Sequence, residues 1–292
     1  MSETHWQSGR LDGFRGPKAL LFGRVYEDSA IEAGVFPAGG RIACIASAGC
    51  TALDLSHQHA VTAVDLNPVQ LAYAQRRAAG APPEEGVAER WMARGRLGLR
   101  LVGWSPERLE TFLGLADPAA QSAFWRDRLD TRGFRLVVDN VLRLTLLSAI
   151  YAAPLLQVLP VPFGPVLRSR LQRGWSRHAN RSNPYARALL LGDLTPPGRP
   201  AGSPIRFVCS DMAEFLESCP PGSFDGFSFS NILDGAGPAY RARLFRAASR
   251  AGTKASMMVH RSFAEPDPDM KWNLAANDRS LLWGVVSVVP LH

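Results

Sequence analysis

Two short apolar runs, separated by small residues and a helix-compatible segment, constrain the fold of this chain most strongly. The first run is RIACIA, Arg41 to Ala46, and the second is VTAV, Val61 to Val64. Unbroken apolar runs of this length are typical of strands buried on both faces of a parallel sheet. Between them stands SAGCTALDLSHQH, which suits a turn and a short helix. The segment therefore predicts a strand–helix–strand unit with parallel strands.

Later segments repeat this alternation of strand and helix. IRFVCS, SFDGFSFS, KASMMVH and WGVVSVVPL have strand patterns, whereas DMAEFLESC and PAYRARLFRAASRAG have helix patterns. Strands that alternate with helices predict a mostly parallel sheet with helices on both faces. We therefore expect an α/β fold of the Rossmann type, as a single domain over residues 1–292.

A long helix-rich stretch interrupts the alternation. Pro68 is expected to open a helix after the second strand, and Ser105 before Pro106 and Asp117 before Pro118 also have the pattern of helix starts. Residues 87–192 are accordingly expected to form a helical insertion that acts as a lid within the α/β domain.

Composition and cysteine spacing exclude several classes of protein. The 292 residues are 46% hydrophobic and 20% charged, which is typical of a globular chain rather than a disordered one. The net charge is +7, but the arginines are spread along the chain, so nucleic acid is not an expected partner. The cysteines lack CxxC spacing and are expected as buried free thiols rather than disulfides or metal ligands. They are Cys44, Cys50, Cys209 and Cys219.

Neither a secretion signal nor a membrane span is expected. Met1 to Arg15 is polar and lacks an apolar core, so we expect a cytoplasmic protein. The most apolar stretch, Leu142 to Leu167, is interrupted by Arg143 and four prolines before it could cross a bilayer as one helix. Peripheral contact with a membrane, or the wall of an apolar pocket, remain alternatives for this stretch. No feature of the sequence indicates an oligomeric state.

Small and acidic residues follow the expected strands at the place where such sheets bind ligands. That place lies beyond the carboxyl ends of the strands, where the strand order reverses. Small residues from Ser47 to Gly49 follow the first strand and allow close approach of a ligand. Asp65 ends the second strand, where a carboxylate can accept two hydrogen bonds from a ribose diol. Asp211 follows a later strand, where it is either an adenine contact or a helix cap.

Together these residues predict a nucleoside site. The turn lacks GxGxxG, which favours a small-molecule substrate such as S-adenosylmethionine over a dinucleotide. The residues expected to contact it are Tyr26, Ser47, Ala48, Gly49, Asp65, Leu66, Asp211, Met212 and Ser230.

Several motifs make the sequence similar to a known family. YEDSAIEA, IASAGCTALDL, AVDLNPVQLA, RSRLQRG, NPYARALLLG, SDMAEFL and GSFDGFSFSNIL resemble the DUF3419 family, known for the 3-amino-3-carboxypropyl transferases of betaine-lipid synthesis. The resemblance runs from about Tyr26 to Arg261. It implies the fold of class I S-adenosylmethionine-dependent methyltransferases, with attack on Cγ of the methionine arm instead of the methyl group. The product released would be 5′-methylthioadenosine.

The resemblance leaves the nucleophile open. Bacterial azetidine-2-carboxylate synthases look like compact relatives, in which the α-amine of the substrate itself attacks Cγ. The alternative is an external acceptor such as the hydroxyl of diacylglycerol, which calls for a general base and an open channel. We expect cyclisation, because the chain is shorter than the lipid transferases and has no evident acceptor-binding extension. A third alternative is a non-catalytic module that binds S-adenosylmethionine without turnover.

Three side chains are expected around the methionine arm. Asn140 is polar within an apolar helix and is either a hydrogen-bond partner of the amine or carboxylate, or part of an interhelical bond. Tyr185 follows Pro184 and is expected as the cation–π partner of the sulfonium, with a core position as its alternative. Ser210 can offer its hydroxyl to the amine. His260 is the histidine expected at a carboxyl end of the sheet and is a candidate base.

Overall fold

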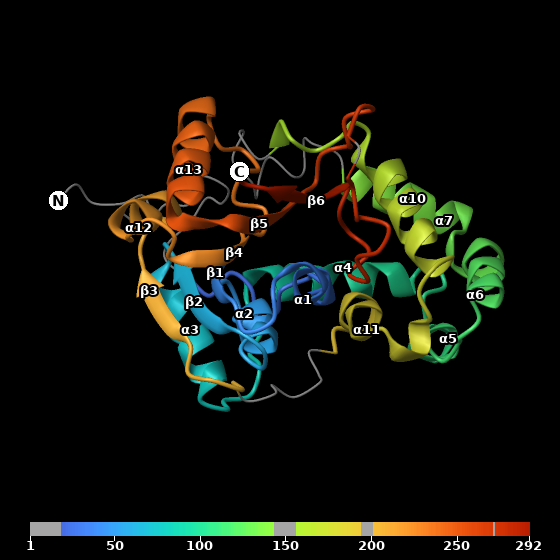
Figure 1. Ribbon diagram of the computed structural model, residues 1–292. Coiled ribbons are helices and arrows are strands. Elements are labelled where there is room, and N and C mark those ends of the chain that lie inside the picture. Colours follow the sequence, from blue (N-terminus) through green and yellow to red (C-terminus); the bar gives the residue numbers. More distant parts are fainter. Residues whose placement is uncertain (1–18, 143–155, 194–200, 271) are drawn as a thin grey trace.

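The computed structural model describes residues 19–142, 156–193, 201–270 and 272–292, and within these ranges the chain builds a six-stranded sheet (Figure 1). The strands are β1 (Arg41–Ile45), β2 (Ala60–Asp65), β3 (Arg206–Cys209), β4 (Phe224–Ser228), β5 (Gly252–Ser262) and β6 (Val285–Pro290). Each strand overlaps a run that the sequence predicts as a strand.

The order of the strands identifies the point where a ligand would bind. They lie in the order β3-β2-β1-β4-β5-β6, with β1 parallel to both β2 and β4, and β6 antiparallel to β5. The chain moves outward from β1 to β2 and β3, then returns to the other side of β1 to form β4. The order therefore reverses between β1 and β4. This mostly parallel α/β sheet is compatible with a Rossmann-like fold, in which ligands bind at such a reversal.

Helices cover both faces of the sheet, as expected. Those next to it are α1 (Ala30–Val35), α2 (Cys50–Leu55), α3 (Pro68–Ala78), α12 (Met212–Ser218) and α13 (Pro238–Ala251). Ile42 and Cys44 of β1 belong to the core formed with α1, α2 and α3. Ala43 of the same strand belongs to the core formed with α12 and α13. Because successive side chains of a strand point to opposite faces, the apolar run in β1 is what two covered faces require.

Between α3 and β3 the described chain is helical, as predicted for that stretch. The elements are α4 (Val87–Arg100), α5 (Pro106–Leu113), α6 (Pro118–Phe124), the π-helix Trp125–Leu129, α7 (Arg132–Val141), α10 (Phe163–Trp175), the 3₁₀-helix Asn180–Ser182 and α11 (Pro184–Leu191). Ser105 caps α5 by accepting from the backbone N–H of Arg108 (3.3 Å), and Asp117 caps α6 through the N–H of Ala120 (2.9 Å). Both predicted helix starts are confirmed.

These helices pack around an aromatic core of their own. Trp104 stacks on Phe134 with ring centroids 4.4 Å apart, and Trp125 lies edge-on to Phe134 at 5.6 Å. Leu281, from the segment between β5 and β6, joins the same core. Figure 1 shows α5, α6, α7, α10 and α11 gathered at the side of the molecule away from β3. The segment that carries Leu281 thus links the helical core to the sheet.

Some sequence predictions fall outside the described residues or need correction. Residues 143–155 of the apolar stretch and the N-terminal residues 1–18 lie outside the described ranges. Within those ranges, no helix has the length and apolar character needed to cross a membrane. Cys44 is a buried free thiol, as expected, whereas Cys50 and Cys219 are half-buried. Cys209, however, is exposed, because β3 is an edge strand of the sheet.

Candidate functional site

Two serines with left-handed backbone stand where the strand order reverses. Ser47 (φ 44°) lies two residues beyond β1, and Ser230 (φ 52°) lies two residues beyond β4. Residues other than glycine rarely adopt positive φ, which costs about 1–3 kcal/mol and persists where the surroundings fix it, often at ligand sites. The sequence predicts both serines as site residues but does not indicate their backbone conformation.

The turn after β1 is built from small residues, as predicted. Gly49 adopts φ 84° before α2, and a Cβ at this position would come within 3.2 Å of the Cβ of Ala74. Ala48 is fully buried, and its carbonyl accepts a hydrogen bond from Nη1 of Arg77 (3.0 Å). The turn is therefore held firmly against α3, with Ser47 as its half-buried member.

Asp65 ends β2 directly beside this turn. Its Oδ2 accepts a hydrogen bond from the backbone N–H of Ser47 (2.9 Å), and its Oδ1 accepts one from the N–H of Asn67 (2.9 Å). Burial raises the pKa of Asp65 to about 6 in spite of these hydrogen bonds. Leu66 follows it and is half-buried. The structure thus brings Ser47 and Asp65 together, and each carboxylate oxygen keeps a lone pair for a second donor.

The residues after β3 have structural contacts of their own. Oδ1 of Asp211 accepts from the backbone N–H of Glu214 (3.0 Å) and caps α12, while Oδ2 accepts from the hydroxyl of Tyr240 (2.7 Å). The Ser210 hydroxyl donates to the carbonyl of Asp211 (3.0 Å). Met212 is buried in the core under α12. The helix-cap alternative for Asp211 is therefore observed, and its adenine contact stays a prediction.

Asn140 stands apart from the other predicted catalytic residues. It lies in the last turn of α7, and its side-chain amide donates to the carbonyl of Leu136 (2.7 Å) in the same helix. Tyr185 and Ser210 lie on α11 and after β3, and among the described residues no hydrogen bond joins the three side chains. Contact of Asn140 with the methionine arm stays a prediction.

Tyr185 is buried in the first turn of α11. Asn183 caps this helix by accepting from the N–H of Tyr185 (3.0 Å) and donates to the carbonyl of Arg279 (2.8 Å). The guanidinium of Arg24 lies 5.1 Å from the ring centroid of Tyr185, and that of Arg279 lies 6.0 Å from it. The ring therefore already has two cationic neighbours, which its negative face attracts. Burial raises the pKa of Tyr185 well above its usual value.

The segment before α1 packs beside the turn after β1, where Val25 joins Ala48 and Tyr73 in a small apolar core. The Tyr26 carbonyl accepts from the indole N–H of Trp283 (2.8 Å), which ties the segment to the C-terminal part of the chain. The Tyr26 hydroxyl is buried and has no hydrogen-bond partner among the described residues. Burial and the nearby Glu89 raise the pKa of Tyr26, so the hydroxyl stays protonated and can donate.

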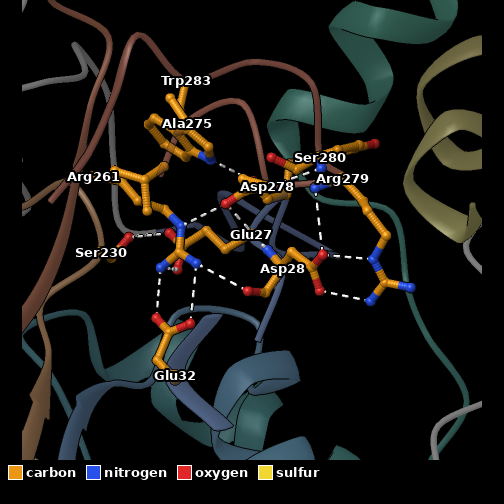
Figure 2. Close-up of polar contacts among 12 residues, drawn as sticks. Glu27, Asp28, Glu32, Ser230, Arg261, Ala275, Asp278, Arg279, Ser280 and Trp283 are labelled. Carbon is orange, nitrogen blue, oxygen red and sulfur yellow. Dashed lines mark hydrogen bonds and ion pairs between the residues drawn. The ribbon is translucent and has the colours of Figure 1, made fainter. Parts of the chain in front are cut away.

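A buried ionic network next to the site was not predicted from the sequence. Figure 2 shows Arg261 at its centre, fully buried, with its guanidinium on both carboxylate oxygens of Glu32 (2.5 and 3.0 Å). Asp278 accepts from Nε of Arg261 (2.9 Å), and Arg279 pairs with Asp28 (2.5 Å). The pattern YEDSAIEA contains three of its acids, but their partners lie more than 200 residues away. We call this set the Arg261 network; it comprises Glu27, Asp28, Glu32, Arg261, Asp278 and Arg279.

Glu27 is the member of the Arg261 network nearest to the turn after β4. The hydroxyl of Ser230 donates to Oε1 of Glu27 in a short hydrogen bond, and Nη1 of Arg261 lies 3.6 Å from Oε2. Burial raises the pKa of Glu27 to about 7, although Arg261 and Ser230 lower it in part. His260, the base suggested by the sequence, has its pKa lowered to about 4 by burial and by two neighbouring arginines. Glu27 therefore titrates near neutral pH and His260 does not.

Comparisons with protein-family models, with curated proteins and with solved structures each found no match.

Proposed function

We propose that the chain binds S-adenosylmethionine at the carboxyl ends of β1 and β2 and cleaves its Cγ–S bond, releasing 5′-methylthioadenosine. The observation that carries the proposal is the pairing of Asp65 with the strained turn at Ser47, at the reversal of strand order. A ligand bound there lies at the position that open α/β sheets use for nucleosides.

The residues at this place fit the adenosine part of the substrate. Asp65 is anchored by two backbone N–H groups, so its orientation is fixed before a ligand arrives. Its remaining lone pairs suit the two adjacent hydroxyls of a ribose. We assign the ribose to Asp65 and the adenine to the side of β3, near Ser210 and Asp211.

The charge of the Arg261 network favours a cationic ligand. In the Arg261 network four carboxyl groups face two guanidinium groups, which leaves an excess of negative charge when all are ionised. S-adenosylmethionine carries a sulfonium and an ammonium group. An acidic environment at low dielectric stabilises both groups more than water-exposed carboxylates would.

Attack at Cγ follows from the motif resemblance, and intramolecular attack by the α-amine is our first assignment, with azetidine-2-carboxylate as product. Which sulfonium carbon reacts depends on which carbon lies in line with the nucleophile at roughly 3 Å. Asn140 and Tyr185 are proposed to hold the methionine arm in the folded conformation that this attack requires. Ser210, which the sequence also suggested for the arm, follows β3 and therefore lies on the adenine side in this assignment.

Transfer to an acceptor hydroxyl is the second candidate, and exposed apolar side chains favour it. Leu101 of the α4 end is 90% exposed and Leu136 of α7 is 67% exposed, both in the helical part that precedes the apolar stretch. Exposed apolar side chains of this kind suit contact with a lipid such as diacylglycerol.

Incubation of the purified chain with S-adenosylmethionine alone distinguishes the candidates. Methylthioadenosine together with azetidine-2-carboxylate supports cyclisation. Methylthioadenosine that forms only after diacylglycerol is added supports the transferase. Binding of S-adenosylmethionine without either product supports the non-catalytic module and contradicts both enzymatic assignments.

A further inference from the structure

Glu27 has a position in the Arg261 network that its structural role does not explain. Its side chain is 5% exposed, yet its closest polar partner is a neutral hydroxyl, that of Ser230. Arg261 is engaged by Glu32 and Asp278 at hydrogen-bond distance, whereas its distance to Glu27 is 3.6 Å. A buried carboxylate without a guanidinium hydrogen bond is costly to ionise. A buried carboxylate in such a position is typical of a functional group rather than of a stabilising ion pair.

Ser230, the hydrogen-bond partner of Glu27, lies at a strand end near that of Asp65. Asp65 ends β2, and Ser230 follows β4, with β1 between these strands. Two strand spacings separate them, on the order of 10 Å. With the ribose on Asp65, the methionine arm extends across the β1 turn toward Ser230. The amino end of the arm then arrives beside Glu27.

We propose that Glu27 is a catalytic residue that takes up the proton of the substrate's α-ammonium group, and that Ser230 positions it for this step. The proposal rests on the proposed function, because it assigns the base for that reaction. It extends the function by giving the acidic network a chemical role.

The step is balanced in protons and electrons. One N–H bond of the α-ammonium breaks, and its proton moves to an oxygen of Glu27. The freed nitrogen lone pair forms the N–Cγ bond, while the electrons of the Cγ–S bond pass to sulfur and leave methylthioadenosine as a neutral thioether. The ring nitrogen keeps two hydrogens as an ammonium. Glu27 then releases its proton to solvent, so one proton is released per turnover.

The surroundings of Glu27 bring its pKa close to neutral pH. Burial raises its pKa to about 7, Arg261 on β5 lowers it, and Glu32 on α1 and Asp278 before β6 raise it. The hydrogen bond from Ser230 also lowers it. A general base works best when its pKa lies near the working pH.

Glu27→Gln tests the proposal, because glutamine keeps the size and the acceptor for Ser230 but cannot take up a proton. The rate of methylthioadenosine formation at saturating S-adenosylmethionine is measured from pH 5.5 to 8.5, beside the affinity for methylthioadenosine. In the wild-type protein the rate should rise through about pH 7 and then level off. E27Q should lose about 100-fold or more in rate, without the step near pH 7, and should bind methylthioadenosine as the wild-type protein does. Glu110→Gln, an exposed carboxyl of α5, is the matched control.

Ser230→Ala provides a second test that does not remove the base. Loss of the Ser230 hydrogen bond raises the pKa of Glu27, so the midpoint of the rate profile should move to higher pH. A merely structural role for this contact would leave the midpoint unchanged. An unchanged midpoint in S230A therefore overturns the proposal even if E27Q does not fold.

The outcomes separate this proposal from the proposed function. A folded E27Q whose rate and pH profile match the wild type overturns the role of Glu27, and the proposed function stands. A wild-type protein that binds methylthioadenosine but never forms it from S-adenosylmethionine contradicts the proposed function and the role of Glu27 with it.

Discussion

At the scale of single residues, Asp65 is central to the proposed nucleoside site. Two backbone N–H groups fix its carboxylate, and burial brings its pKa to about 6. The protonated form would lose acceptor capacity toward a ribose diol. Affinity for the nucleoside is therefore expected to depend on pH near the lower end of the physiological range.

We expect the dissociation constant for methylthioadenosine to rise about tenfold per pH unit below pH 6, because binding requires the ionised carboxylate. Methylthioadenosine has no group that titrates in this window. Asp65→Asn should bind about 10- to 100-fold more weakly at pH 7.5, since hydrogen bonds to a charged group contribute about 1.5–3 kcal/mol. Its affinity should no longer change with pH between 5 and 7.5, as isothermal titration calorimetry can measure.

Asp225→Asn is the control for this experiment, because Asp225 pairs with Arg41 at the opposite, amino end of the sheet. It should leave affinity and its pH dependence unchanged. If Asp65→Asn binds methylthioadenosine as tightly as the wild type does, the nucleoside does not bind at the end of β2.

The ring of Tyr185 is the proposed partner of the sulfonium group. If its ring holds the sulfonium, Tyr185→Phe should keep turnover within a few-fold, because the ring and not the hydroxyl makes the contact. Tyr185→Ala should lose about 30-fold or more at saturating substrate, the equivalent of about 2 kcal/mol for a desolvated cation–π contact. The comparison is made on protein shown to be folded, since the side chain is buried. Equal losses in the two variants would assign the effect to the hydroxyl and contradict the role of the ring.

At the scale of elements, the Asn183 side chain both caps α11 and joins its start to the segment between β5 and β6. Asn183 accepts from two N–H groups at the start of the helix and donates to the Arg279 carbonyl. Asn183→Ala should lower the free energy of unfolding by about 1–3 kcal/mol, and Asn183→Asp should lose less because it keeps the cap. Urea denaturation monitored by tryptophan fluorescence measures both. A loss below about 0.5 kcal/mol in Asn183→Ala would show that α11 does not depend on this cap.

The sequence predicts local elements well and long-range contacts poorly, for a physical reason. Alternation of apolar runs and caps such as Ser105 is a local property, so strands, helix starts and the positions of Ser47 and Asp65 at two strand ends could be predicted. Arg261 and Glu32 lie 229 positions apart, and neither has a sequence pattern that names the other as partner. The left-handed backbone at Ser230 is likewise imposed by tertiary contacts, since local preference disfavours it.

At the scale of the whole molecule, the Arg261 network joins the two ends of the described chain. It links the segment before α1 with β5 and with the segment between β5 and β6, and the latter also reaches the helical core through Leu281. Buried contacts therefore connect the sheet, the segment before α1 and the helical part with one another. A change at its centre should affect the stability of the entire fold.

Arg261→Met tests whether the Arg261 network stabilises the entire fold. Removal of the buried guanidinium leaves Glu32 and Asp278 without compensation, and we expect a loss of about 3–5 kcal/mol in the free energy of unfolding. Arg243→Met is the matched control, because Arg243 forms an equally short ion pair with Glu217 on the exposed surface of α13 and α12. It should lose less than about 1 kcal/mol. Similar losses in both variants, measured by urea denaturation, would contradict a central role for Arg261.

Cyclisation of S-adenosylmethionine, with cleavage of its Cγ–S bond, is the reaction that we propose for the chain. The most direct measurement follows S-adenosylmethionine labelled with ¹³C at Cγ by NMR, in the presence of the purified protein and no acceptor. We expect the label to move into azetidine-2-carboxylate while an equal amount of methylthioadenosine forms. Unchanged substrate, or formation of S-adenosylhomocysteine with the label still attached to sulfur, would contradict it.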